Sequence, residues 1–198
     1  MEFLEGRELK DLIAGSELTV DHALEIAAQV ADGLAYAHQH DVVHRDIKPA
    51  NIMILSDGRV KITDFGIARM RSADVRTQTG VVLGSPRYLS PEQVLGKRSD
   101  GRADIFSLGV IIYEMICGQT PFNGIDVNSL MFQIVNAAPP PPSSINAALP
   151  AMLDLIIAKA LAKSADERYA GIAELAADLR ACRQQGLGGI VPPLIAAA

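Results

Sequence analysis

One short run of the sequence combines a carboxylate, an ammonium and an amide, namely Asp46, Lys48 and Asn51 in HRDIKPAN. A second carboxylate follows at Asp64, in the tripeptide DFG. Asn51 and Asp64 offer the hard oxygen ligands that suit Mg²⁺ bound together with substrate phosphates. Lys48 can place a positive charge against a phosphoryl oxygen, and Asp46 can accept a proton from a hydroxyl group. Together these residues predict a phosphate-and-metal site.

Short strands and a turn must position this set. The runs 42–46, 51–55 and 59–65 are rich in β-forming residues, and SDG at 56–58 predicts a hairpin turn between the last two. Residues 67–90 follow with no clean periodicity, and a long irregular segment inside a compact domain is usually functional or mobile. We therefore expect a hairpin that leads into a functional loop.

Helices make up most of the remaining chain. Apolar residues in 19–38 recur at helical spacing, with Thr19 placed as the N-cap and Asp21 in the first turn. Residues 103–117 are apolar on nearly every face, which predicts a buried central helix that ends at Gly118. Further helices are expected at 8–13, 127–136, 149–162 and 171–183. Outside the helices we expect extended chain at 1–4, an extended proline-rich connector at 138–144, and a linker or tail at 186–198.

Composition narrows the functional classes. The chain has 198 residues, 49% hydrophobic and 21% charged, a balance typical of a soluble globular domain. Acidic residues (23) outnumber basic ones (18), and the net charge of −5 gives no electrostatic footprint for nucleic acid. Two cysteines cannot supply a disulfide framework. No run of about 18 apolar residues and no positively charged leader is present, so we expect no membrane segment and a cytoplasmic location.

The motifs resemble those of eukaryotic-type protein kinases. HRDIKPAN resembles the catalytic loop of that family, DFG its metal-binding motif, and Ser90-Pro91-Glu92 stands where the family has A-P-E. Lys48 and the segment 84–88 are similar to the serine/threonine branch, and MEFLEGREL, TQTG and YLSPEQ resemble its bacterial members. The resemblance implies an α+β, mostly α-helical fold. It is that of a kinase C-terminal lobe, in which a short β-hairpin carries the catalytic and DFG loops.

The resemblance also implies roles for the four polar residues. Asp46 would align and partly deprotonate the substrate hydroxyl, and Lys48 would steady the γ-phosphoryl group of ATP during transfer to a protein substrate. Asn51 and Asp64 would hold Mg²⁺, or Mn²⁺ in its place. These assignments make Asp46, Lys48 and Asn51 the expected catalytic set.

Further residues are implied to bind the nucleotide or to support the site. Glu2, Phe3 and Leu4 would form the hinge whose backbone binds adenine, and Met53 would pack beneath the adenine ring. A second group is expected to be structural: His44 and Phe65 in a buried column, Asp104 as an anchor of the catalytic loop, and Glu92 paired with Arg168.

A regulatory switch is implied by Arg45, which immediately precedes Asp46. In kinases with this arginine, a phosphorylated residue of the loop pairs with the guanidinium and orders the segment. Thr77 and Thr79 are the candidate phosphorylation sites, with ordinary loop hydroxyls as the alternative reading.

The family's glycine-rich loop, strand lysine and helix glutamate all precede the hinge, and this sequence starts at the hinge. We therefore expect residues 1–185 to be a partial kinase domain without its N-terminal lobe, inactive as an isolated chain. Protein substrates and the missing lobe are the expected partners. Two alternatives stay open: a non-catalytic lobe that serves interaction or regulation, and a small-molecule phosphotransferase that shares the loop chemistry.

Overall fold

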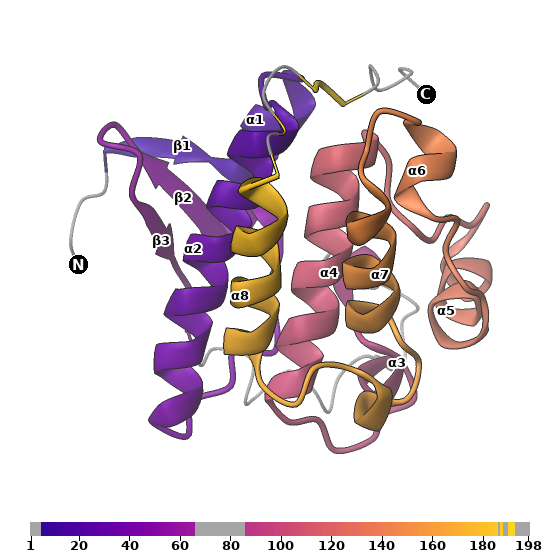
Figure 1. The fold of residues 1–198 in the computed structure, drawn as a ribbon. Helices are drawn as coiled ribbons and strands as arrows, with labels where there is room; N and C mark the ends of the chain where they lie inside the picture. The colour runs from indigo at the N-terminus through magenta and orange to yellow at the C-terminus, as the bar shows by residue number, and fades with distance from the viewer. Residues whose placement is uncertain (1–4, 66–85, 186, 188–189, 193–198) are drawn as a thin grey trace.

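The computed structural model of the chain describes residues 5–65, 86–185, 187 and 190–192, and Figure 1 shows their arrangement. In chain order the elements are β1 (Gly6–Glu8), α1 (Leu9–Ala14), α2 (Val20–Gln39), η1 (Pro49–Asn51), β2 (Ile52–Leu55), β3 (Val60–Ile62), η3 (Pro86–Tyr88), α3 (Pro91–Val94), α4 (Gly101–Cys117), α5 (Val127–Asn136), α6 (Pro142–Ile145), α7 (Ala151–Ala160), η4 (Ala165–Glu167) and α8 (Ile172–Arg183). The described chain is mostly helical, as expected, with one small antiparallel sheet.

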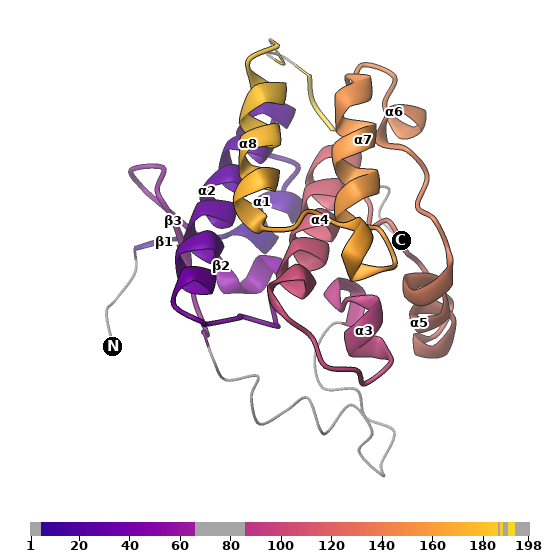
Figure 2. The ribbon, with the colours of Figure 1, turned by 60° about the horizontal axis from the view of Figure 1, so that its bottom comes forward.

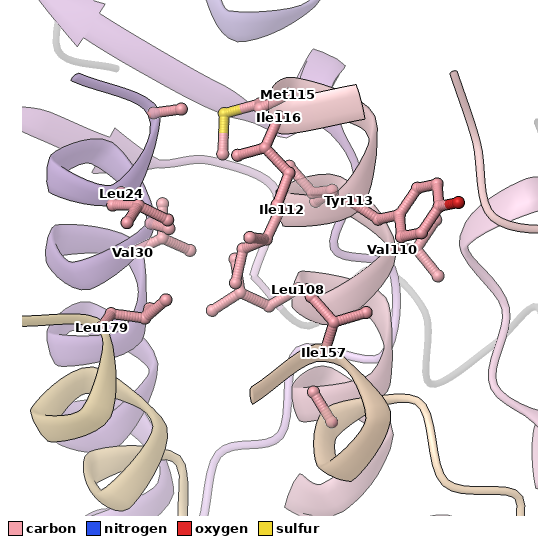
Figure 3. Close-up of a cluster of buried hydrophobic side chains, with 14 of the residues drawn as sticks. Leu24, Val30, Leu108, Val110, Ile112, Tyr113, Met115, Ile116, Ile157 and Leu179 are labelled. Carbon is pink, nitrogen blue, oxygen red and sulfur yellow. The ribbon is translucent and has the colours of Figure 1, made fainter. Parts of the chain in front are cut away.

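The helix α4 runs through the centre of the molecule, between α2 and α8 on one side and α7 on the other (Figure 1). Its apolar residues are buried on nearly all sides, and Figure 3 shows Leu108, Ile112 and Ile116 pointing toward the α2 and α8 side. Each such side chain contributes about 1.5–3 kcal/mol when it is fully removed from water. The central helix predicted for 103–117 is therefore confirmed, and Gly118 ends it in the left-handed conformation, with φ of 68°.

The three strands pair antiparallel in the order β1-β2-β3 and lie against α2, on the side of the molecule away from α5 (Figure 2). The hairpin predicted between β2 and β3 is confirmed. Gln29 of α2 fixes it, because its side chain donates to Gly58 O (3.2 Å) and accepts from the amide of Val60 (3.0 Å). The long helix α2 begins where Thr19 accepts a hydrogen bond from the amide of His22, as the capping prediction requires.

Two local expectations were wrong, and one strand was missed. Residues 42–46 form no strand, because the amides of His44 and Arg45 donate to the carboxylate of Asp104 and not to a neighbouring strand. A strand that the sequence did not predict occurs at Gly6–Glu8. The proline-rich connector is not extended throughout, since Pro142 begins α6, where the missing amide of a first helical residue costs nothing.

The described residues of 186–198 contact the helical body. The amide of Val20 donates to Ile190 O (2.9 Å), Asn146 Nδ2 donates to Val191 O (3.1 Å), and Leu187 is buried. Over the described part of the chain, no helix combines the length and the apolar character that crossing a membrane requires.

Candidate active site

The structure brings Asp46, Lys48 and Asn51 together on one turn. Lys48 Nζ lies 2.7 Å from Asp46 Oδ2, and Asn51 Nδ2 donates to Asp46 O (2.9 Å) and, more weakly, to Asp46 Oδ2 (3.4 Å). The turn η1 creates this proximity, because Pro49 is preorganised for its first position and the amide of Asn51 closes onto Lys48 O (2.9 Å). Asn51 is buried, whereas the Asp46 side chain is 48% exposed.

A strained backbone presents Asp46. The preceding residue, Arg45, has a φ of 66°, a left-handed conformation that costs a non-glycine residue roughly 1–3 kcal/mol. The buried carboxylate of Asp104 in α4 compensates by accepting from the amides of His44 (2.9 Å) and Arg45 (2.7 Å). Asp104 therefore anchors residues 44–46, the segment predicted to be catalytic, and the ring of His38 adds a third contact of 2.8 Å to the same carboxylate.

The imidazole of His44 joins the catalytic turn to the strand that leads to Asp64. Its Nε2 donates to Thr63 O (2.9 Å), since a carbonyl can only accept, and its Nδ1 accepts from the amide of Asp46 (3.3 Å). The ring of Phe65 meets it edge to face, with 4.8 Å between ring centres. His44 is fully buried, but Phe65 is 40% exposed, so only the histidine end of the expected buried column is enclosed within the described residues.

Asp64 follows β3 by two residues, close to Asn51. The amide of Thr63 donates to Asn51 O (2.9 Å), and Asp64 follows in the left-handed conformation with φ of 62° and an exposed side chain. Met53 is half-buried on β2, where Glu8 and Lys61 are its partners in register. Five of the predicted site residues lie outside the described part of the chain: Glu2, Phe3, Leu4, Thr77 and Thr79.

The donor set fits a magnesium ion that is shared with phosphates. Because Asn51 uses its Nδ2 for the bonds to Asp46, its Oδ1 is the atom left for a cation. Asp64 offers carboxylate oxygens next to Thr63, whose amide donates to Asn51 O. Among the described residues, no group of three or more His, Cys, Asp or Glu side chains forms a complete metal cage. Mg²⁺ is typically held by one or two protein oxygens, with phosphate and water completing its shell.

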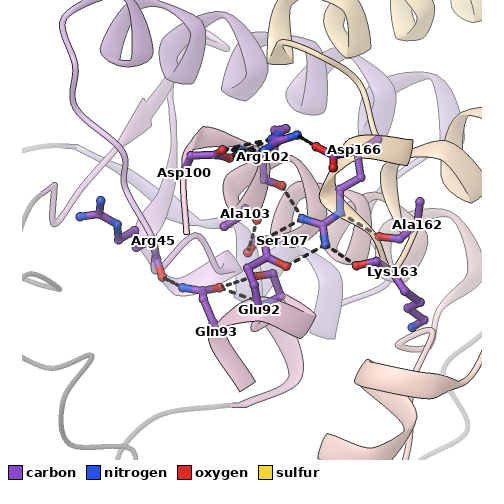
Figure 4. Close-up of polar contacts among 12 residues, drawn as sticks. Arg45, Glu92, Gln93, Asp100, Arg102, Ala103, Ser107, Ala162, Lys163 and Asp166 are labelled. Atoms are coloured by element: carbon purple, nitrogen blue, oxygen red, sulfur yellow. Dashed lines mark hydrogen bonds and ion pairs between the residues drawn. The ribbon is translucent and has the colours of Figure 1, made fainter. Parts of the chain in front are cut away.

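A buried ion pair between Glu92 and Arg168 lies next to the site. Arg168 binds both carboxylate oxygens of Glu92 at 2.8 Å, and the Arg168 side chain is fully buried. Burial is the largest single effect and would raise the pKa of Glu92, but the hydrogen bonds from Arg168, a backbone amide and Ser90, together with the charge of Arg168, outweigh it, so the pKa lies below its ordinary value. The expected Glu92–Arg168 pair is therefore confirmed, and Figure 4 shows the carbonyl groups of Ala162 and Lys163 in the same network.

Sequence reasoning missed Gln93 and His38. Gln93 Nε2 donates to Arg45 O (2.7 Å), a contact visible in Figure 4, and His38 binds Asp104. The spacing of Ser90 and Gln93 is that of a capping box, which the sequence could have revealed. Neither the Gln93–Arg45 contact nor the His38–Asp104 contact has a sequence signal, because each spans a large separation along the chain.

Comparison with known proteins places the chain in a family. The protein kinase domain family matches residues 1–178. The chain is 43% identical over 182 residues to the serine/threonine-protein kinase PknB of Mycobacterium tuberculosis (strain ATCC 25618 / H37Rv), covering 90% of this chain and 29% of that protein. It is 40% identical over 186 residues to the serine/threonine-protein kinase PknL of the same strain, covering 93% of this chain and 47% of the relative. The chain thus belongs to the protein kinase domain family, and it spans less than half the length of these two relatives.

Proposed function

We propose that the chain is the catalytic lobe of a serine/threonine protein kinase, which transfers the γ-phosphoryl group of ATP to Ser and Thr hydroxyls of proteins. The observation that carries this proposal is the cluster of Asp46, Lys48 and Asn51 on one turn, tied through Thr63 to the strand that delivers Asp64. The two relatives compared above are named serine/threonine-protein kinases, which supports the choice of acceptor.

The roles follow from the chemistry of each group. Asp46, exposed at the turn, accepts the proton of the substrate hydroxyl. At the same time the hydroxyl oxygen bonds to the γ-phosphorus, and the bond between that phosphorus and the ADP oxygen breaks. Lys48 lies beside Asp46 and stabilises negative charge on the phosphoryl oxygens. Asn51 Oδ1 and the Asp64 carboxylate would hold Mg²⁺, which neutralises charge on the phosphates when bound. The same two oxygen ligands would also suit Mn²⁺.

The adenine end of the nucleotide is assigned from the family pattern. By that pattern Glu2, Phe3 and Leu4 would serve as the hinge that binds adenine, and Met53 on β2 would pack beneath the ring. We further propose that residues 1–185 act as the kinase part and 186–198 as a tail that returns to the helices through Ile190.

An apolar groove supports the proposal that a second lobe covers this one. The groove has a volume of about 530 Å³ and runs between α2 and β3, with Tyr36, Val42 and Phe65 exposing 67%, 39% and 40% of their surface. Aromatic surface of this extent, contiguous with the DFG phenylalanine, is typical of a docking face. The ATP-binding lobe of the family is the occupant that would also complete the nucleotide site.

The test is complementation. The 198-residue chain alone, given ATP, Mg²⁺ and a generic protein substrate, should show no Asp46-dependent phosphorylation. Fusion to the ATP-binding lobe of a PknB relative should restore it, Asp46→Asn should abolish it, and Asp57→Asn in the exposed hairpin turn should leave it unchanged. Robust activity of the isolated chain would overturn the need for a second lobe. A folded but inactive wild-type fusion would favour the alternative, a non-catalytic interaction or regulatory module.

We also propose that the guanidinium of Arg45 binds a phosphorylated threonine of the segment 67–90. Its backbone is held by Asp104 and Gln93, and among the described residues no hydrogen bond or ion pair engages its guanidinium. Phosphorylated Thr77 or Thr79 would supply about two negative charges and three acceptor oxygens. Mass spectrometry of the active fusion should find phosphate there, and Thr77→Ala/Thr79→Ala should be markedly slower. Full activity in that double variant would remove the switch and leave the catalytic assignment intact.

A further inference from the structure

We propose that Gln93 is a positioning residue for Asp46: its side-chain amide holds the carbonyl of Arg45 and thereby fixes the left-handed turn that presents the carboxylate. The inference rests on the proposed kinase function, in which Asp46 accepts the hydroxyl proton. Gln93 lies in α3, 48 residues from Arg45 in sequence, and its Nε2 lies 2.7 Å from Arg45 O.

The orientation of the Gln93 amide is unambiguous. Its Oε1 accepts from the amide of Ser90 (3.0 Å) and lies 3.0 Å from the hydroxyl of the same residue, which is fully buried. Its Nε2 faces a carbonyl, which can only accept. Turning the amide over would set two donors against each other at Ser90 and two acceptors at Arg45. The side chain therefore spans from the cap of α3 to the catalytic segment in one arrangement.

Arg45 is held on both sides of its strained backbone. Its amide donates to Asp104 at 2.7 Å, and its carbonyl accepts from Gln93 at 2.7 Å. Because the carbonyl of Arg45 belongs to the same peptide group as the amide of Asp46, fixing it fixes the direction in which Asp46 leaves the turn. Without Gln93, this peptide group would keep only the long bond from the amide of Asp46 to His44 Nδ1 (3.3 Å), a weak restraint against rotation out of the left-handed conformation, with φ of 66°, that is disfavoured at an arginine.

The capping role does not explain why the residue is glutamine. A glutamate at the same helical position also completes a capping box with Ser90, and its charge suits the first turn of a helix. Only the contact with Arg45 O requires a donor. Gln93→Glu therefore separates the two roles: it keeps the cap and places a carboxylate oxygen against the carbonyl of Arg45.

The first experiment needs no enzymatic activity. Hydrogen–deuterium exchange of the 198-residue chain, followed by mass spectrometry, should show peptides covering 42–48 exchanging about fivefold to tenfold faster in Gln93→Glu, the effect of losing one hydrogen bond. Peptides from α4 and α8 should be unchanged. Gln184→Glu, at the exposed end of α8, is the matched control and should exchange as wild type throughout.

The second experiment uses the fusion with an ATP-binding lobe. Gln93→Glu should lower kcat about tenfold and leave KM for ATP unchanged, since the lost contact orients Asp46 and does not bind nucleotide. Ser90→Ala weakens the cap of α3 but keeps the bond to Arg45, so its kcat and its exchange at 42–48 should stay near wild type. If Gln93→Glu does not fold, Gln93→Met, which retains the side-chain length without a donor, takes its place.

The outcomes are distinct. Wild-type exchange at 42–48 in Gln93→Glu, or equal acceleration in Ser90→Ala, would show that Gln93 only caps α3 and would overturn the proposal. If the wild-type fusion has no kinase activity, the proposed function fails, whereas the exchange result still decides whether Gln93 holds the turn.

Discussion

All five N–H groups of the Arg168 guanidinium donate hydrogen bonds to protein acceptors, and two of them bind the carboxylate of Glu92 in parallel at 2.8 Å each. The remaining three donate to the carbonyls of Ala162, Lys163 and Arg102. One buried side chain thus ties α3 to the start of α4 and to the segment after α7. Because Gln93 lies next to Glu92 and contacts the catalytic segment, the same helix links this ion pair to the candidate active site.

Removing one partner of this pair should be costly. Arg168→Met leaves the Glu92 carboxylate buried without its counter-ion, and we expect the free energy of unfolding to fall by about 3–5 kcal/mol in urea titrations. Arg180→Met breaks an exposed ion pair with Asp32 and should cost less than about 1 kcal/mol. Similar losses in the two variants would mean that burial of the Glu92–Arg168 pair does not matter.

The Glu92–Arg168 pair also predicts that the free energy of unfolding falls at acid pH. Burial raises the pKa of Glu92, but the hydrogen bonds and charge of Arg168, with the bonds from a backbone amide and Ser90, hold it below the ordinary value of 4.5. A lowered carboxyl pKa contributes stability that is present above about pH 4.5 and is lost as the pH falls through the lowered value. Glu92→Gln should flatten that part of the pH dependence.

Asp104 should be indispensable to the catalytic turn. Asp104→Asn leaves only one acceptor oxygen for the two amides of His44 and Arg45. The new NH₂ group faces the second of these amides, which is itself a donor. We expect a loss of about 2–3 kcal/mol in the free energy of unfolding, the size of a lost charged hydrogen bond. Asp100→Asn is the matched control on the same helix, because asparagine caps a helix as well as aspartate does. An equal, small effect at both positions would contradict the anchoring role.

Lys163 predicts a second pH dependence of the same direction, in the alkaline range. Its ammonium donates to Ile134 O (2.7 Å) and lies 3.9 Å from the centre of the Phe122 ring; burial, and then the charge of Arg168, lower its pKa to about 8. Between pH 8 and the ordinary value of 10.5, the unfolded state binds more protons than the folded state, so the free energy of unfolding rises with pH in this window.

The measurement is a difference between variants. Thermal unfolding of Lys163→Met should lack the rise between pH 8 and 10.5, whereas Lys159→Met, which removes a more exposed lysine of α7, should retain it. The same pH profile in both variants would show that the rise belongs to other groups.

Much of the fold was predictable because its signals are local. The all-round apolar character of 103–117 indicated the buried helix α4, and the range of α5 matches the predicted 127–136. Caps at Thr19 and Gly118 were read from residue type alone. The absence of a strand at 42–46 was not predictable, because it depends on a carboxylate about sixty residues away in α4 that takes the backbone amides.

The candidate site divides in the same way. Asp46, Lys48 and Asn51 stand within one turn, so their spacing in the sequence already implied their proximity in space. The family pattern supplied the Glu92–Arg168 pair, which no local signal indicates. His38 and Gln93 were missed, because each reaches the catalytic segment through tertiary packing, from α2 by way of Asp104 and from α3 directly.

The metal assignment is tested by Asp64→Asn in the fusion with an ATP-binding lobe. Asparagine tolerates the left-handed backbone of Asp64 and has the same shape, so the fold should be retained. It loses the charge that would hold Mg²⁺, and we expect kcat to fall about a thousandfold, the equivalent of several kcal/mol of transition-state stabilisation. Asp41→Asn is the control, since Asp41 is also exposed and left-handed, with φ of 59°, but lies in the turn that follows α2 and outside the DFG motif. Titration of both variants with Mg²⁺ and Mn²⁺ should show a raised metal requirement for Asp64→Asn only. An Asp64→Asn enzyme within a few-fold of wild type at the same metal concentration would mean that another residue holds the ion.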